Sequence, residues 1–128
     1  MQNKYHAPFA EGHFYHIFNR GNNKQTIFFK QENYRYFLVK FDEYMCDFLE
    51  VYGFCLLPNH FHFLARAKEN LAGLQDLQGL GPSNTRCRIA QAFSNFFNGY
   101  TKAINRQEGR TGNLFQRNFK RILIDKEG

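Results

Sequence analysis

The sequence predicts an α+β fold, the ferredoxin-like βαββαβ arrangement, with an antiparallel sheet that carries its helices on one face. Four short segments alternate their side chains with the two-residue period of a strand, and two longer segments place apolar residues at helical spacing. In chain order they give strand, helix, strand, strand, helix, strand. With 128 residues and 43% hydrophobic content, the chain is expected to form a single domain over residues 1–128.

The first strand and the first helix come from the N-terminal third of the chain. Residues 13–19 alternate with a period of two, and the Gly-Asn-Asn run at residues 21–23 ends this strand. Between residues 31 and 48 apolar residues recur at helical spacing, which predicts an amphipathic helix with one stripe in the core. The stripe comprises Tyr34, Phe37, Leu38, Phe41, Tyr44, Met45 and Phe48.

The other strands and the second helix follow downstream. Residues 50–57 and the strand that begins at His60 form an antiparallel hairpin around a two-residue connection, Pro-Asn. Residues 70–83 are rich in Gly, Gln and Leu and predict a loop, and Ser83 or Asn84 is expected to cap the second helix. Residues 117–125 alternate as a fourth strand. The apolar face of the second helix comprises Ile89, Ala92, Phe93, Phe96, Phe97, Tyr100 and Ile104.

Two histidines separated by one residue are the clearest chemical signal in the chain. His60 and His62 lie in a predicted strand, so they share one face about 7 Å apart, while Phe61 and Phe63 point into the core. Two imidazoles at this spacing can converge on one divalent ion. The plain alternative is a pair of half-exposed, hydrogen-bonded histidines without a metal.

Further ligands for such an ion have to come from other elements, because the His60 strand contains no Asp or Glu. The usual strand order of this fold places the first strand beside it and brings His16 or Arg20 near the pair. A structural zinc site that adds Cys55 is a separate possibility, since thiolate and imidazole both suit zinc.

The positive charge is concentrated in the last third of the chain. Residues 1–85 hold eight Lys/Arg and eight Asp/Glu, whereas residues 86–128 hold nine and three, which accounts for the whole net charge of +6. A clustered positive field attracts a polyanion, and with a pI near 9.4 nucleic acid is the leading candidate partner. The alternative is a solvated basic face without a partner.

Cysteine content and hydropathy exclude several classes of protein. Cys46, Cys55 and Cys87 are odd in number and show no Cys-x-x-Cys spacing, which argues against a disulfide framework and a zinc ribbon. The sequence shows neither an apolar run long enough for a membrane span nor the pattern of a signal peptide. We therefore expect a cytoplasmic protein that does not contact a membrane.

Several motifs together resemble one known family. In order they are the Tyr-His-Ile and Asn-Arg-Gly-Asn segments at 15–22, Leu-Pro-Asn-His-Phe-His at 57–62, Tyr100-Thr101 with Asn105, and Gly-Asn-Leu-Phe-Gln-Arg-Asn-Phe at 112–119. The chain resembles the HUH-superfamily single-tyrosine transposases, most of all their REP-associated branch. Residues 71–85 depart from the family pattern in length and in their Gly and Gln content.

The resemblance implies a function. It implies a metal-dependent DNA transposase that cuts and rejoins single strands through a 5′-phosphotyrosyl intermediate, with His60 and His62 holding Mg²⁺ or Mn²⁺. It also implies binding of single-stranded or hairpin DNA and assembly as a homodimer. The alternative function is a nucleic-acid-binding module on a ferredoxin-like sheet, without catalysis.

The resemblance places the nucleophilic tyrosine on a helix after the last strand, beyond Gly128. We therefore expect this chain to lack its catalytic-tyrosine helix and to be inactive alone. Tyr100 is the only tyrosine after the histidine pair, and its place on an apolar helical stripe predicts a buried hydroxyl, so it is only a fallback nucleophile. The expected phosphate-contacting residues are Arg20, Lys24, Arg110, Arg117, Lys120 and Arg121.

Overall fold

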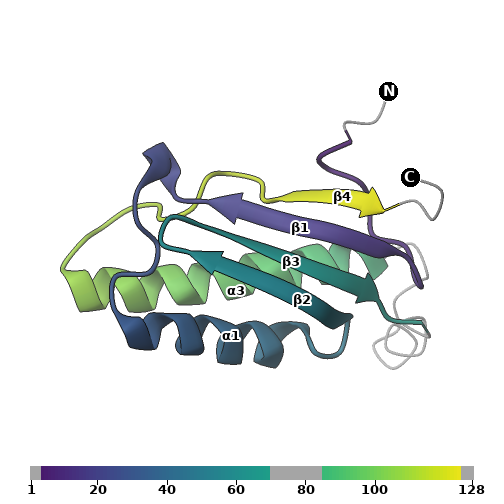
Figure 1. Ribbon diagram of the computed structural model, residues 1–128, viewed down its shortest axis with the longest axis horizontal. Coiled ribbons are helices and arrows are strands. Elements are labelled where there is room, and N and C mark those ends of the chain that lie inside the picture. Colours follow the sequence, from purple (N-terminus) through teal and green to yellow (C-terminus); the bar gives the residue numbers. More distant parts are fainter. Residues whose placement is uncertain (1–3, 70–84, 125–128) are drawn as a thin grey trace.

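The computed structural model describes residues 4–69 and 85–124, and within them it confirms the ferredoxin-like βαββαβ order (Figure 1). Four antiparallel strands form one sheet in the order β2-β3-β1-β4. The expected loop at 70–83 and the expected caps Ser83 and Asn84 lie outside the described residues. The elements are β1 (Phe14–Arg20), the short 3-10 helix η1 (Asn22–Lys24), α1 (Gln31–Met45), β2 (Leu49–Leu57), β3 (His60–Ala67), α3 (Thr85–Glu108) and β4 (Lys120–Ile124).

Two predicted boundaries were wrong. The fourth strand begins at Lys120 rather than at residue 117, and Asn118 just before it has a positive φ of 60°, which does not fit a strand. The first helix ends at Met45 rather than at residue 48, and the next strand already begins at Leu49. Leu49 is buried and pairs with Ala67 of β3, so strand pairing takes over where helical spacing alone would extend the helix. Phe48 therefore packs against the core from the turn between the two elements.

The register of the sheet brings β1 against the histidine strand. Arg20 lies opposite His60 and Phe18 lies opposite His62, while on its other edge β1 pairs with β4. The outer edge of β4 is covered by the N-terminal segment, because the Arg121 amide donates to the Tyr5 carbonyl at 2.8 Å. The strand order expected for this fold is thus confirmed.

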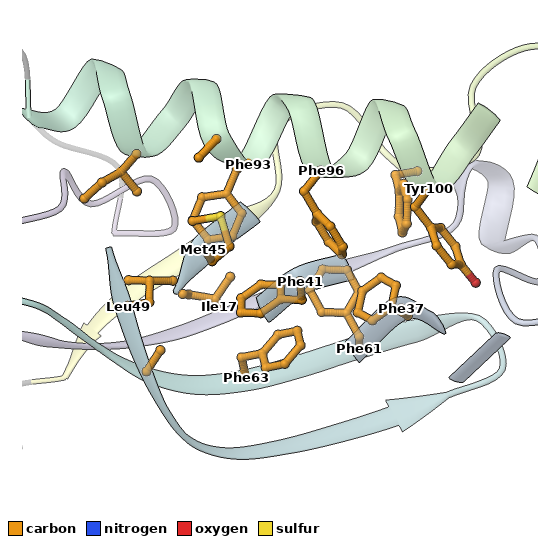
Figure 2. Close-up of a cluster of buried hydrophobic side chains, with 14 of the residues drawn as sticks. Ile17, Phe37, Phe41, Met45, Leu49, Phe61, Phe63, Phe93, Phe96 and Tyr100 are labelled. Carbon is orange, nitrogen blue, oxygen red and sulfur yellow. The ribbon is translucent and has the colours of Figure 1, made fainter. Parts of the chain in front are cut away.

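An aromatic core fills the space between the sheet and the two helices (Figure 2). Phe41 of α1 stacks on Phe63 of β3 with ring centroids 4.1 Å apart, and Phe37 meets Tyr100 of α3 edge to face at 5.0 Å. Offset and edge-to-face ring pairs of this kind add to the free energy gained by apolar burial. The helices cover one face only, so the opposite face of the sheet is left open.

Tyr100 is part of this core. Its side chain is 1% exposed, and its hydroxyl donates a 2.7 Å hydrogen bond to the Ile27 carbonyl. Burial is the main cause that raises the pKa of Tyr100 far above its usual value. The prediction that this hydroxyl is buried is confirmed.

The segment of residues 21–28, which begins within the Arg-Gly-Asn-Asn motif, packs directly on the turn of the β2–β3 hairpin. The Gly21 amide donates to the Asn59 carbonyl at 2.9 Å, and the amides of Ile27 and Phe28 both donate to the Pro58 carbonyl. A Cβ at Gly21 would lie 2.0 Å from the Gln25 carbonyl oxygen, so only glycine fits here. These contacts fix the turn that precedes His60.

Candidate functional site

The open face of the sheet carries the histidine pair. His60 and His62 of β3 are half-buried and lie on this face, whereas Phe61 and Phe63, at 0% and 1% exposure, point toward the helices. The prediction that the two histidines share a face opposite the core is confirmed. Their ring centroids are 5.1 Å apart and their planes are nearly perpendicular, at 88°.

Each of the two histidines makes a hydrogen bond through its Nδ1 atom. His60 Nδ1 lies 2.8 Å from Asn59 Oδ1, and His62 Nδ1 lies 2.8 Å from Nε2 of His16 on β1. Within residues 4–69 and 85–124, neither His60 nor His62 makes a hydrogen bond through Nε2. The atom free on each ring is therefore Nε2, which is one of the two imidazole nitrogens that bind metals in proteins.

The environment favours the neutral imidazole at His16 and at His62. Burial lowers the pKa of His16, and burial together with the nearby His16 and His60 lowers the pKa of His62. A neutral imidazole has a free lone pair for a metal ion, whereas imidazolium has none. The donor set thus fits a divalent ion that accepts nitrogen ligands and keeps further positions open.

An apolar hollow of about 460 Å³ lies beside these histidines on the open face. Its lining includes His16, His62 and Cys55, and Cys55 lies opposite His62 in the β2–β3 register. Within residues 4–69 and 85–124, no group of three His, Cys, Asp or Glu side chains is placed to hold a metal ion. The described residues therefore do not assemble the zinc site that was considered with Cys55.

Two of the expected phosphate-contacting residues lie beside the histidines. Arg20 ends β1 opposite His60, and Lys120 begins β4 opposite Phe18, which itself lies opposite His62. With the Gln116 amide turned so that both its oxygen and its nitrogen have partners, its oxygen accepts a 2.8 Å hydrogen bond from Nε of Arg20. The strand ends thus place two cations at the histidine end of the open face.

Two other candidates lie in the connecting segments. Arg110 donates to the side chains of Gln25 and Asn105 and to the Asn113 carbonyl, so its guanidinium ties the end of α3 to the segment after η1. Lys24 is exposed on η1 with a positive φ of 60°. Neither residue makes a hydrogen bond to His60 or His62 within the part of the chain that the structure describes.

Arg117 and Arg121 lie toward α3. Both line a polar cleft of about 680 Å³ between α3 and residues 113–121, and Arg117 is exposed there. The Arg121 guanidinium lies 4.9 Å from the Phe119 ring and donates from Nε to the Ala7 carbonyl at 2.9 Å. Burial lowers the pKa of Arg121, and these contacts give this residue a structural role.

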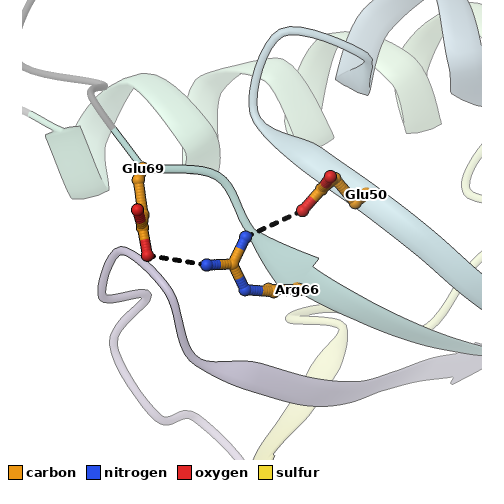
Figure 3. A network of polar contacts seen from close by, with 3 residues as sticks. All are labelled: Glu50, Arg66 and Glu69. Carbon is orange, nitrogen blue, oxygen red and sulfur yellow. Dashed lines mark hydrogen bonds and ion pairs between the residues drawn. The ribbon is translucent and has the colours of Figure 1, made fainter.

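At the other end of the open face, a cation is already neutralised. Arg66 of β3 donates to Glu50 at 2.8 Å and to Glu69 at 2.7 Å (Figure 3). Sequence reasoning gave no sign of this network, because Glu50 and Glu69 are distant from each other along the chain. It also missed the hydrogen bond from His60 to Asn59, for which the only signal is their adjacency.

Comparison with known proteins gives a likeness in structure alone. No protein-family model and no curated protein matches the sequence. Among solved structures, the chain is similar to a REP-associated tyrosine transposase bound to a REP hairpin, with a TM-score of 0.58 and 15% sequence identity. The match covers 98% of this chain but 64% of that one, so the chain spans less than two thirds of its length.

At this level of identity the likeness shows the fold and does not carry over an activity. It agrees with the ferredoxin-like class found above. None of the described helices is long and apolar enough to cross a membrane.

Proposed function

We propose that this chain is an HUH-type DNA strand-transferase domain of the single-tyrosine transposase class, which binds single-stranded or hairpin DNA on the open face of its sheet. The observation that carries the proposal is the pair His60 and His62 on that face, each with Nδ1 engaged and Nε2 free. The solved structure of similar fold, a transposase bound to a DNA hairpin, supports the choice of DNA over other polyanions.

In this proposal Nε2 of His60 and Nε2 of His62 hold one Mg²⁺ or Mn²⁺ ion. Such an ion, when bound, polarises a phosphate oxygen and neutralises the charge that develops on it. The histidines remain neutral ligands and transfer no proton. The nitrogen ligands alone would also admit zinc, and Mg²⁺ or Mn²⁺ is proposed from the resemblance to the family.

Arg20 and Lys120 bind the DNA backbone next to this pair. Both lie at the histidine end of the sheet, where phosphate oxygens would accept hydrogen bonds from them. Phe18, whose ring centroid lies 4.6 Å from that of His16 and 5.6 Å from that of His62, adds an aromatic surface for an unpaired base. Together they favour single strands, whose bases are free to stack.

Tyr100 is not the nucleophile in this proposal. Its hydroxyl faces the Ile27 carbonyl inside the core, on the helix side of the sheet, whereas the histidines occupy the opposite side. No other tyrosine follows the histidine pair in the sequence.

The second candidate function is DNA or RNA binding without strand cleavage. The buried hydroxyl of Tyr100 favours it, because the described residues then offer no tyrosine downstream of the pair to attack a phosphate. Under this function, the two histidines and the neighbouring cations form a binding surface only.

One experiment separates the two functions. A single-stranded DNA with a hairpin, labelled at its 3′ end because a 5′-phosphotyrosyl link would retain the 3′ fragment, is incubated with the chain in Mn²⁺ or in EDTA. Binding is measured under native conditions, and the products are resolved under denaturing conditions. DNA binding that Mn²⁺ strengthens, with the gain lost in His62→Ala and kept in Tyr100→Phe, supports the metal site of the strand transferase even without cleavage, because Tyr100 is not the nucleophile in this proposal. Tight binding that is the same in Mn²⁺ and EDTA, without cleavage, supports the binding module.

A further inference from the structure

We propose that His16 is a positioning residue, which accepts a hydrogen bond from Nδ1–H of His62 and thereby holds the tautomer that presents Nε2 of His62 to a divalent ion. The inference rests on the proposed function, since it concerns the same metal pair. It adds a third histidine, from a different strand, to the two of the His-Phe-His motif.

The geometry of the contact requires one donor and one acceptor. His16 Nε2 and His62 Nδ1 are 2.8 Å apart, a distance at which one proton is shared between the two nitrogens. Each neutral imidazole carries its proton on one ring nitrogen only. If His62 donates, its Nε2 is left with a lone pair; if His16 donates, the proton of His62 is on Nε2 and that atom cannot bind a metal.

The neighbouring histidine indicates which of the two arrangements holds. Asn59 Oδ1, 2.8 Å from Nδ1 of His60, can only accept, so His60 carries its proton on Nδ1 and has a free Nε2. If His62 is protonated on Nδ1 as well, both rings on the open face have a free Nε2. Ligand histidines almost always donate their second nitrogen to an acceptor in this way.

His16 is itself held in place by its surroundings. It lies on β1, which is flanked on both sides by other strands, and its ring stacks on Phe18 at 4.6 Å and on His62 at 5.0 Å. The ring cannot turn without breaking these contacts. A fixed acceptor restricts both the tautomer and the rotation of the His62 ring, which is what preorganises a ligand.

The competing explanation is that the bond between His16 and His62 only satisfies two polar side chains. Such a role would tolerate either direction of the hydrogen bond. It also predicts the same Mn²⁺ affinity for a substitution that keeps an acceptor and for one that removes it, provided that both variants fold.

The first test reads the tautomers directly in the metal-free chain. Long-range ¹H–¹⁵N correlation spectra of ¹⁵N-histidine-labelled protein, recorded at neutral pH, report which ring nitrogen carries the proton. We expect His60, His62 and His16 all to carry it on Nδ1. A His62 protonated on Nε2 overturns the proposal, and this result is independent of any metal or DNA.

The second test compares variants by Mn²⁺ affinity, measured by electron paramagnetic resonance of the free ion. His16→Phe removes the acceptor and should weaken binding about 10–100-fold. His16→Gln restores an acceptor oxygen and should recover most of the affinity. His13→Phe is the matched control, since His13 is exposed at the start of the sheet, and it should bind Mn²⁺ as the unmodified chain does.

The outcomes separate this inference from the proposed function. If the unmodified chain binds no Mn²⁺, the metal part of the proposed function fails, while the His62 tautomer still decides the role of His16. Equal affinity in the unmodified chain, His16→Phe and His16→Gln overturns the positioning role. If His16→Phe does not fold, the tautomer of His62 in the unmodified chain and in His16→Gln decides.

Discussion

The two faces of the sheet differ in chemistry although they are built from the same strands. Along β3, Phe61, Phe63 and Ala65 are buried under the helices, while His60, His62 and Leu64 alternate with them on the open face. The covered face gains its stability from contacts between rings. The open face contributes little to the core, so it is free to hold polar groups with unused hydrogen-bonding atoms. The fold and the proposed site therefore depend on different residues of one strand.

Shortening two adjacent side chains of β3, one on each face, should give very different losses of stability. Phe63→Ala should lower the free energy of unfolding by about 3–5 kcal/mol, because it leaves a cavity among packed rings. Leu64→Ala is the matched control; Leu64 is 40% exposed, so the loss should stay within about 0.5 kcal/mol. Urea unfolding measures both. Similar losses for the two variants would show that the open face is covered in solution.

Removing either histidine of the open face should reduce metal binding without reducing stability. His60→Ala and His62→Ala should each reduce Mn²⁺ affinity on the order of 100-fold or more, since removing a ligand costs at least as much as removing its hydrogen-bonding partner. Their midpoints of urea unfolding should stay close to that of the unmodified chain. Paramagnetic broadening of histidine resonances locates the ion; broadening centred on His6 or His13 would reject the pair as the site.

Tyr100→Phe tests a polar atom on the covered face. The variant removes the donor to the Ile27 carbonyl, which should cost about 1–3 kcal/mol of unfolding free energy, because a buried acceptor is left without a partner. DNA binding should be unchanged, since the hydroxyl lies on the side away from the histidines. Loss of a covalent protein–DNA adduct in this variant would instead make Tyr100 the nucleophile.

Substitutions of cations at the two ends of the open face compare those ends, and their effects on DNA binding should be small. Arg20→Gln and Lys120→Gln should each weaken binding of single-stranded DNA and reduce the slope of log affinity against log salt by about 0.7, the value for one phosphate contact. Arg66→Gln should leave that slope unchanged, because Glu50 and Glu69 already pair with Arg66. Fluorescence anisotropy across a salt series gives both quantities. Equal slopes in all three variants would place the DNA elsewhere.

Periodicity in the sequence was enough to predict the strands, the helices and the face on which the histidines lie. The reason is that the alternation of residues 60–63 depends only on strand geometry, which is local. The predicted end of α1 was wrong because Leu49 pairs with Ala67 of β3. This pairing joins distant parts of the chain, so helical spacing along the sequence cannot indicate it.

The details of the site depended on contacts between distant segments. The bond between His16 and His62 joins two strands, and its two atoms can be identified only once the register is known. Arg121 stays a predicted DNA contact, and its charge alone could not show that its guanidinium packs on Phe119 and donates to the Ala7 carbonyl. Charge in a sequence does not distinguish a free cation from one that already has partners.

The contact between residues 21–28 and the β2–β3 turn couples the motions of these two segments. Because the carbonyls of Pro58 and Asn59 accept the amides of Ile27, Phe28 and Gly21, neither segment can open without the other. Local unfolding of η1 and of the β2–β3 turn should then be a single cooperative event with one free energy of opening. The orientation of His60 would consequently have the lifetime of that combined unit, rather than the shorter lifetime of an isolated hairpin turn.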